Sequence, residues 1–245
     1  MKKACIIIPT YNERENLKKL IPSLMDVSKN IKNYKTHITV CDDNSPDGTA
    51  QLVTDLAKEH KNLHILLGPK HGLGVAYQRG FRYAMQHNFD VIVMMDADLS
   101  HPPSLLPRML AEIDKGYDFV IGSRYIPGGA TPDWSLRRRL ISFTGNFFAR
   151  IVGGMYSVHD CTSGYRALRV DKLRKINFRD LATRGYAFMT TLLYEMYMSG
   201  AKIKEVPLIF YDRKIGQTKL KPRDMVEFFI NSFRLRIKTY RRSKK

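Results

Sequence analysis

In the first half of the chain, short runs of apolar residues alternate with segments in which an apolar residue recurs every three or four positions. The short runs predict β-strands at residues 4–8, 37–41, 64–67, 91–95 and 119–122. The amphipathic segments between them predict helices at residues 14–28, 49–59, 74–87 and 103–115. Continuous apolar strands that alternate with amphipathic helices are typical of a parallel sheet with helices on both faces, so the pattern predicts an α/β fold.

The alternation loosens from Pro127, where Pro and Gly residues predict a long loop. Beyond this loop we expect helices at residues 136–152, 186–198 and 222–240, and strands at residues 165–170 and 203–212, the second interrupted by Pro207. No internal repeat or clean linker divides the chain. We therefore expect one catalytic domain over residues 1–221, followed by a basic amphipathic helix and tail over residues 222–245.

The composition excludes several classes of protein. With 44% hydrophobic and 26% charged residues among 245, the chain is neither disordered nor a small disulfide scaffold. No window of about 18 residues is free of charge and apolar throughout, so no membrane-spanning helix is expected. The three cysteines, Cys5, Cys41 and Cys161, form no C-x-x-C pair, which predicts buried thiols in a reducing compartment. The start of the chain becomes polar too early for a signal peptide, and we expect a cytoplasmic protein.

The charge of the chain is strongly positive and unevenly placed. Its 41 Lys and Arg residues outnumber its 23 Asp and Glu residues, which gives a net charge of +18. Residues 201–245 hold 14 of the basic residues and four of the acidic ones, and residues 137–139 form a second basic group. Such patches attract polyanions: nucleic acid, anionic lipid or a phosphorylated substrate. Charge alone leaves all three open.

Polar clusters follow the predicted strands at residues 9–13, 42–45, 96–100 and 123–125. In an open α/β sheet, ligands bind at the edge where the parallel strands end, so these clusters should meet there. Asp96 and Asp98 are two residues apart just beyond a strand, and two such carboxylates can hold one hard cation against a diphosphate. The chain has no Walker loop and no G-x-G-x-x-G after its first strand, so phosphates are not held in either of those ways.

Six motifs in a fixed order carry a resemblance to a known family: PTYNE, DDNSPDGT, MDADLSHPP, GSRY, DCTSGYRALR and DRKIGQTK. Together they resemble the family 2 glycosyltransferases, over about residues 4–220. The resemblance implies a GT-A fold (the nucleotide-diphospho-sugar transferase fold), with a Rossmann-like, mostly parallel sheet and helices on both faces. Within that family the chain is most similar to the dolichyl-phosphate mannose synthases, in their short form without transmembrane helices.

The resemblance implies a role for each cluster on the side of the nucleotide-sugar. The residues that would bind this donor are Pro9, Tyr11, Glu13, Val40, Asp42, Ala97, Asp98, Arg213 and Lys219. A carboxylate suits guanine because the base offers two neighbouring N–H donors, whereas uracil offers one, so GDP is preferred over UDP. Asp98 would be the main ligand of Mg²⁺ or Mn²⁺, with Asp96 and Ser100 beside it. Some members of the family have Gln where this chain has Ser100.

On the acceptor side the resemblance assigns the phosphate of a lipid to Arg124, Arg138 and Ser142, and Asp96, Asp98 and Arg124 would be catalytic. Arg138 and Ser142 are one helical turn apart and face the same way. Arg137 and Arg139 are weaker candidates. A phosphate monoester is ionised at neutral pH and attacks without a general base, so such an enzyme depends on positioning and charge neutralisation. Ser163 and Gly164 would shape the sugar pocket or form a plain turn, and His101 is expected to be an ordinary loop residue.

The sequence therefore predicts an inverting glycosyltransferase that moves mannose from GDP-mannose to dolichyl or polyprenyl phosphate. We expect it at the cytoplasmic face of a membrane, as a peripheral protein. Two alternatives stay open: transfer of glucose or N-acetylglucosamine from a UDP-sugar to the same lipid, and a basic nucleic-acid-binding protein. The second is supported by charge alone and leaves the strand-end clusters unexplained, so no nucleic acid is expected as a partner.

The last predicted helix carries an apolar stripe with basic residues around and after it. The stripe consists of Met225, Phe228, Phe229, Ser232, Phe233 and Ile237. An apolar stripe with a basic flank is typical of a helix that lies in a membrane surface. The same stripe would also serve to dock a small membrane subunit, or to pack against the protein's own sheet.

Overall fold

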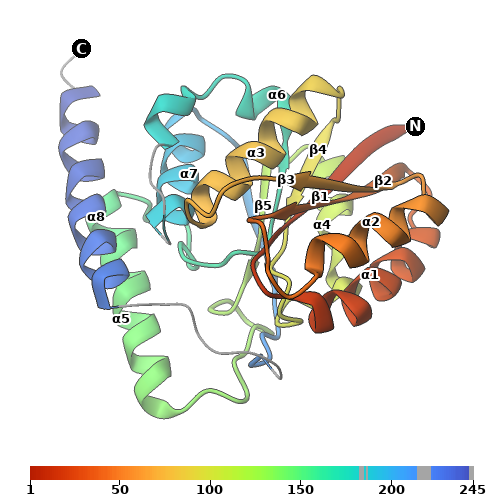
Figure 1. The fold of residues 1–245 in the computed structure, drawn as a ribbon. Coiled ribbons are helices and arrows are strands. Elements are labelled where there is room, and N and C mark those ends of the chain that lie inside the picture. The colour runs from red at the N-terminus through yellow and green to blue at the C-terminus, as the bar shows by residue number, and fades with distance from the viewer. Residues whose placement is uncertain (182–184, 186, 214–221, 243–245) are drawn as a thin grey trace.

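The fold is built on a seven-stranded sheet with the strand order β3-β2-β1-β4-β6-β5-β7. This computed structural model describes residues 1–181, 185, 187–213 and 222–242, with the side chains of residues 179–180, 222–225 and 238–242 left aside. The strands are β1 (Lys2–Thr10), β2 (Tyr34–Asp42), β3 (Leu63–Leu67), β4 (Val91–Met94), β5 (Phe119–Ser123), β6 (Arg166–Arg169) and β7 (Ile203–Pro207). Figure 1 shows the sheet at the centre of the molecule, with helices before and behind it.

Six of the strands run parallel, as predicted, and β6 runs antiparallel between β4 and β5. The chain leaves β5 at the edge where the parallel strands end and comes back to the same edge to begin β6. Because β6 starts where its neighbours finish, the loop that precedes it joins the strand-end loops of the sheet. The apolar pattern predicted neither the direction of β6 nor the order of the strands, and the strand expected at residues 203–212 ends at Pro207.

Both faces of the sheet are covered, because alternate side chains of each strand point to opposite faces. Ile6 and Ile8 of β1 belong to one apolar core, and Cys5 and Ile7 belong to the other. The helices on the first face are α1 (Arg14–Lys29), α2 (Thr49–Glu59) and α4 (Leu106–Asp114), and those on the second are α3 (Leu73–Gln86) and α7 (Ala187–Met198). The short elements are 3₁₀ turns at Pro103–Leu105 and Phe178–Leu181 and the helix α6 (Val170–Leu173).

Two further helices, α5 (Leu136–Gly153) and α8 (Pro222–Arg242), lie side by side at one end of the molecule (Figure 1). Leu235 of α8 is buried in the core, and Phe228 packs against it. Asn231 of α8 donates a buried hydrogen bond of 2.9 Å to the Thr191 hydroxyl of α7. Phe228, part of the apolar stripe of α8, therefore packs on the protein itself. This packing was one of the three roles that the sequence left open for the stripe.

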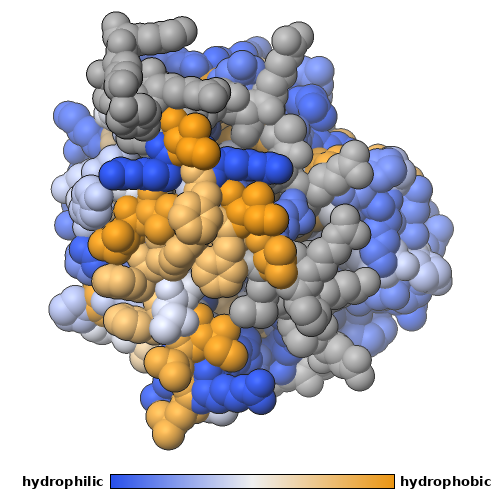
Figure 2. Space-filling view, turned by 90° about the vertical axis from the view of Figure 1, so that its left-hand side faces the viewer, coloured by the Kyte–Doolittle hydropathy of each residue, from blue (hydrophilic) through white to orange (hydrophobic). Residues whose placement is uncertain are grey.

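The outward side of these two helices is an exposed apolar surface, which we call the α5–α8 face. Its large exposed side chains are Leu140, Ile141, Phe143, Phe147 and Ile151 from α5, and Val226, Phe229, Ile230, Phe233 and Ile237 from α8. Figure 2 shows apolar side chains gathered on this side of the molecule, bordered by hydrophilic ones. Among the described residues, no helix has the length and hydropathy that crossing a bilayer requires.

All three cysteines are free and fully buried. Cys5 and Cys41 lie in β1 and β2, and Cys161 lies in the loop before β6. Burial raises the pKa of each of the three thiols to about 12. The prediction of buried, unpaired thiols is therefore confirmed.

Candidate active site

The predicted polar clusters meet at one edge of the sheet. Thr10, Asp42 and Ser123 are the last residues of β1, β2 and β5, and the Asp96 cluster follows β4 directly. The loop before β6 reaches the same edge because that strand runs in the opposite direction. This edge is the place where open α/β sheets bind their ligands.

Asp42 ties the loop after β2 to the end of β1. Its carboxylate accepts hydrogen bonds from the Thr10 hydroxyl at 2.8 Å and from the backbone and hydroxyl of Ser45 at 2.8 and 2.5 Å. Arg79 of α3 donates to the Asp42 carbonyl and, at 2.9 Å, to the carboxylate of Asp43. Asp42 has no exposed surface. In this arrangement its carboxylate orders the two loops, and its contact with the base of a nucleotide stays a prediction.

The other nucleotide candidates divide into surface and core residues. Tyr11 lies at the surface with the Lys70 ammonium 3.3 Å above its ring, and Glu13 accepts a hydrogen bond of 2.7 Å from Asn16. Pro9 is part of β1 beside β2 and is half-buried. Val40 is wholly enclosed in the core beneath β2. Its side chain points inward along the strand, so it supports the loops from below and does not line the site.

Asp98 is held in place by its own loop. The Ser100 backbone N–H and hydroxyl donate to its Oδ1 at 3.2 and 2.5 Å, and Leu99 between them has a φ of 66°. A leucine in the left-handed region is uncommon, and such backbone is found at functional sites. Ser100 is almost fully buried and its hydroxyl orients Asp98; its role as a metal ligand stays a prediction. The Arg213 guanidinium lies 3.4 Å from the other oxygen of Asp98.

Asp96 sits beside Asp98 with 37% of its side chain exposed. The Tyr77 hydroxyl is 3.5 Å from its Oδ1, and its backbone N–H donates to Nδ1 of His101 at 3.0 Å. Protein atoms enclose the rest of the carboxyl, and this desolvation, with the charge of Asp98, raises the pKa of Asp96 in spite of His101. The neighbouring Ala97 is buried.

His101 is not the ordinary loop residue that we expected. It is buried, with its ring stacked on Tyr165 at a centroid distance of 5.0 Å. Desolvation lowers its pKa, so the ring is neutral at pH 7 and accepts the Asp96 N–H. Only its place directly after the acidic cluster pointed to this role in the sequence.

The acid pair leaves room for a cation. A Cβ placed on Gly164, in the loop before β6, would come within 3.3 Å of Asp96 Oδ2 and of the His101 ring, so glycine keeps the space beside the carboxylate open. Hard divalent cations prefer oxygen ligands, and magnesium often takes one or two carboxylates with phosphate oxygens. No group of three His, Cys, Asp or Glu side chains with metal-binding geometry occurs among the described residues. Asp96 and Asp98 could hold a cation together with oxygen donors from a bound ligand, such as those of a diphosphate.

Arg124 is fixed by a buried carboxylate. Its Nε and Nη2 each donate to Asp160 at 2.8 Å, its backbone N–H donates at 3.0 Å, and Nη2 reaches the Thr162 hydroxyl at 2.7 Å. Burial alone would raise the pKa of Asp160, but the charge and hydrogen bonds of Arg124 outweigh it and lower that pKa. Asp160, to which the sequence assigned no role, also accepts the Ser163 N–H. The ion pair thus joins the end of β5 to the loop before β6.

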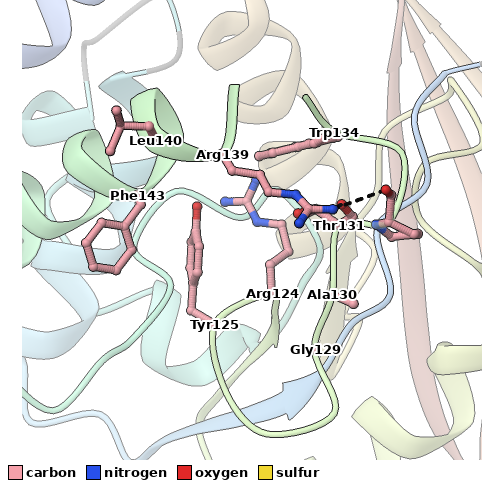
Figure 3. A pocket seen from close by; sticks show the side chains of 10 residues that line it. Arg124, Tyr125, Gly129, Ala130, Thr131, Trp134, Arg139, Leu140 and Phe143 are labelled. Atoms are coloured by element: carbon pink, nitrogen blue, oxygen red, sulfur yellow. Dashed lines mark hydrogen bonds between the residues drawn. The ribbon is translucent and has the colours of Figure 1, made fainter. Parts of the chain in front are cut away.

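A pocket of about 520 Å³ opens beside Arg124. Figure 3 shows Arg124 and Arg139 entering it from opposite walls beneath Trp134, with Tyr125 and Phe143 closing one side. Arg139 donates to the carbonyls of Thr131 and Pro132 at 3.0 and 3.2 Å. The Phe143 end of the pocket belongs to the α5–α8 face. One end of the pocket is therefore cationic and the other is apolar.

Arg138 lies against Trp134, which lines this pocket. Its Nη1 lies 2.5 Å from a carboxylate oxygen of Asp212, and its guanidinium lies 4.3 Å from the centre of the Trp134 ring. The Ser142 hydroxyl, one turn along α5, accepts a hydrogen bond of 2.8 Å from Tyr125. Arg137 is exposed, and Lys219 lies outside the described residues. Three of the candidate arginines, at positions 124, 138 and 213, thus reach the same edge of the sheet.

Comparisons with known proteins identify the family of the chain. The model of the family named glycosyl transferase family 2 matches residues 5–176. The polyprenol monophosphomannose synthase of Mycolicibacterium smegmatis is 39% identical over 221 residues, which are 89% of this chain and 81% of that protein. The undecaprenyl-phosphate mannosyltransferase of Micrococcus luteus is 39% identical over 226 residues, 92% of this chain and 90% of that protein.

Among solved structures, the chain is similar to mannosyl-3-phosphoglycerate synthase from Rubrobacter xylanophilus. The TM-score is 0.68 at 18% identity, and the match covers 99% of this chain and 75% of that one. At this identity the likeness concerns the fold. It confirms the predicted GT-A fold with its mostly parallel sheet.

Proposed function

The chain belongs to glycosyl transferase family 2, and on that premise we propose that it transfers mannose from GDP-mannose to the phosphate of a polyprenyl lipid such as dolichyl phosphate. The two relatives at 39% identity are named for mannose transfer to polyprenol and undecaprenyl phosphate. They support the sugar and the acceptor. GDP as the carrier of the sugar is our own inference from the family resemblance of the sequence motifs.

One observation carries the proposal: the acid pair and the cationic pocket occur at the same sheet edge, and the pocket opens toward the α5–α8 face. The acid pair suits a nucleotide diphosphate with its cation. The pocket suits a molecule with a phosphate at one end and a hydrocarbon at the other. A lipid phosphate is such a molecule. A sugar or a nucleic acid has no hydrocarbon chain that would occupy the apolar end.

On the donor side, Asp98 and Asp96 would hold Mg²⁺ or Mn²⁺, and Ser100 would fix the orientation of Asp98. When bound, the cation supplies positive charge to the leaving diphosphate. Arg213 lies close enough to Asp98 to add its own charge at the same place. His101 and Tyr77 position Asp96 without charge of their own, so the negative potential of the pair is kept for the donor.

On the acceptor side, arginines would hold the lipid phosphate and align one of its oxygens with the anomeric carbon of the sugar. That oxygen forms the new bond while the bond from the same carbon to the diphosphate breaks, which inverts the configuration. The phosphate is already ionised at pH 7, so no side chain has to remove a proton. Arg124, Arg138 and Ser142 suit this reaction, because guanidinium groups and a hydroxyl can hold a phosphate and none of them has to accept a proton.

We further propose that the α5–α8 face rests on the cytoplasmic surface of the membrane. Exposed apolar patches of this kind mark interaction sites, and Arg234 and Arg236 beside it are exposed and would attract anionic headgroups. The acceptor stays in the bilayer, so a surface contact next to the pocket delivers its phosphate directly. Docking of a small membrane subunit onto the same face is the alternative use of this surface.

A donor panel tests the proposed function. Purified protein is given GDP-mannose, UDP-glucose or UDP-N-acetylglucosamine with a short polyprenyl phosphate and Mn²⁺, and the glycolipid formed is measured. We expect product from GDP-mannose alone. Efficient transfer from a UDP-sugar would replace mannose with that sugar, and a protein that binds nucleic acid regardless of added GDP-mannose would contradict the transferase proposal.

A further inference from the structure

One carboxylate, that of Asp212, connects the acceptor end of the site to the donor end. Its Oδ2 lies 2.5 Å from Nη1 of Arg138, and its Oδ1 accepts the backbone N–H of Arg213 at 2.9 Å. The guanidinium of Arg213 in turn lies 3.4 Å from Asp98. Two ion pairs joined by a backbone hydrogen bond therefore connect the acceptor arginine to the acid pair, and Asp212 belongs to both the first ion pair and the hydrogen bond.

We propose that Asp212 is an internal substitute for the acceptor phosphate, which displaces it from Arg138, and that this displacement adjusts Arg213 beside Asp98. Asp212 is thus a positioning residue that couples the two halves of the site. The inference rests on the proposed function, because it takes the anion that binds Arg138 to be a phosphate monoester.

The pair is suited to exchange. The side chains of Arg138 and Asp212 are 40% and 36% exposed, and ion pairs exposed to this degree contribute little stability. A phosphate monoester carries more negative charge than a carboxylate and offers three oxygens, so it binds a guanidinium more strongly. The two anions also repel each other, so a phosphate at Arg138 drives Asp212 away from it.

The hydrogen bonds of the segment before and at Asp212 allow a movement of this residue to reach Arg213. Up to Phe210 the backbone is fixed to the loop before α5, where Phe210 donates to Ala130 at 2.8 Å and Ala130 donates to Leu208 at 3.0 Å. At Asp212 the contacts are with side chains, namely Arg138 and the Asp133 carboxylate, which accepts the Asp212 N–H at 3.2 Å. Asp212 can therefore move without disturbing the segment before it, and it carries Arg213 along.

The coupling has to act in both directions. If binding at Arg138 shifts Arg213, then a nucleotide and cation that displace Arg213 from Asp98 must shift Asp212 and make Arg138 available. The donor and the lipid phosphate are therefore expected to bind more tightly together than separately. Replacement of Asp212 by an uncharged residue removes this dependence.

The single tryptophan of the chain, Trp134, reports on the exchange because its ring lies under Arg138. Geranyl phosphate, a short polyprenyl phosphate, is titrated into the wild-type protein, Asp212→Asn and the charge-matched control Asp55→Asn, an exposed residue of α2, with tryptophan fluorescence and calorimetry as readouts. The titrations are repeated with GDP-mannose and Mn²⁺ present. Thermal unfolding shows whether each variant is folded, and Asp212→Ala serves as a second variant.

We expect Asp212→Asn to bind geranyl phosphate about 3- to 10-fold more tightly than wild type when no donor is present, with Asp55→Asn unchanged. We also expect the gain in affinity that GDP-mannose and Mn²⁺ give the wild type to disappear in Asp212→Asn. If the wild type binds and both Asp212 variants bind equally or more weakly, the role of Asp212 is wrong and the proposed function stands. If the wild type binds no geranyl phosphate, the proposed acceptor is wrong and this inference falls with it.

Discussion

Arg124 and Asp160 form a two-pronged ion pair, with Nε and Nη2 of the guanidinium each 2.8 Å from a carboxylate oxygen, inside the edge of the sheet. The Asp160 carboxylate is fully buried and the Arg124 side chain is 8% exposed. A guanidinium held in this way is rigid, and most of its charge is balanced. We infer that Arg124 sets the shape of the pocket and that the less buried Arg138 supplies the exchangeable contact for an anion.

Breaking the Arg124–Asp160 pair should destabilise the protein strongly, because either partner alone would be a buried charge without compensation. We expect Asp160→Asn to lower the free energy of unfolding by about 3–5 kcal/mol at pH 7. Denaturant titration followed by circular dichroism measures this loss. A change below 1 kcal/mol, with the fold intact, would contradict it.

The same pair has a defined pH dependence. Because the folded pKa of Asp160 is lowered, its contribution is complete above the unfolded pKa of about 3.9 and is lost as the pH falls through the folded value. The stability difference between wild type and Asp160→Asn should therefore be constant from about pH 5 upward and shrink below about pH 4. Unfolding curves of both proteins across this acid range are the measurement, and a difference that grows on acidification would be the opposite result.

Asp98→Ala should reduce transfer by about 10²- to 10³-fold or more, since it removes the carboxylate that we propose holds the cation against the diphosphate. Activity of the wild type should vanish in EDTA and return with Mn²⁺ or Mg²⁺. Asp55→Asn, a change of an exposed carboxylate on α2, serves as the matched control for charge. Full turnover in chelator would refute the assignment of the acid pair.

Gly164→Ala should reduce transfer by about 10- to 100-fold with little change in stability. The added methyl group would lie 3.3 Å from Asp96 Oδ2 and occupy space that the cation or the sugar needs. The control is Gly116→Ala, where a Cβ meets nothing within 4 Å but the positive φ of 96° strains the backbone. That variant should lose stability and keep activity. Equal activity of Gly164→Ala and wild type would mean that the space is not used.

Arg138→Ala should raise the KM for the lipid phosphate by about 10- to 100-fold, because a charge-assisted contact is lost, while GDP-mannose still binds. Calorimetry with GDP-mannose and kinetics with varied lipid separate the two effects. Arg137→Ala, a change of an exposed neighbour on the same helix, is the control. Loss of GDP-mannose binding in Arg138→Ala with unchanged lipid kinetics would show that this arginine serves the donor.

Point changes on the α5–α8 face test the membrane contact better than removal of α8, because Leu235 and Asn231 of that helix are buried. We expect the pair Phe147→Ser and Phe233→Ser to lower binding to anionic vesicles by about 10-fold or more, with unchanged thermal unfolding. Leu67→Ser removes an exposed apolar side chain outside the α5–α8 face and should have no effect. Flotation of vesicles with and without added salt measures the binding, and undiminished flotation of the double variant would refute the contact.

The parallel strands and their helices could be predicted because each strand is a continuous apolar run and each helix repeats its apolar residues at helical spacing. The direction of β6 could not, since a strand of four residues reads the same in both directions. The pairing of Arg124 with Asp160 joins positions 36 residues apart, and nothing local in the sequence links them. Val40 was assigned to the nucleotide by the family resemblance, but it lies within a buried strand and its side chain is enclosed in the core.

The apolar surface of α5 was overlooked for a similar reason. Phe143 and Phe147 repeat at helical spacing, and that spacing does not say whether the apolar side meets a core or the exterior. In the sequence, α8 differs from α5 by the basic residues that surround and follow its apolar stripe. The structure shows that the two helices share one exposed face. Both carry apolar residues at helical spacing, but only in α8 did neighbouring basic residues point to a surface contact.

The burial of the three thiols has a practical consequence. A maleimide reacts with thiolate at an accessible sulfur, and Cys5, Cys41 and Cys161 have neither property while the protein is closed. Each modification therefore counts one opening event. Cys5 and Cys41 lie in the central strands and record opening of the sheet, whereas Cys161 lies beside Asp160 and records opening of the loop before β6. The ratio of their labelling rates measures the difference between the free energy of opening the loop and that of opening the sheet. The three cysteines are therefore internal probes of opening at the active site.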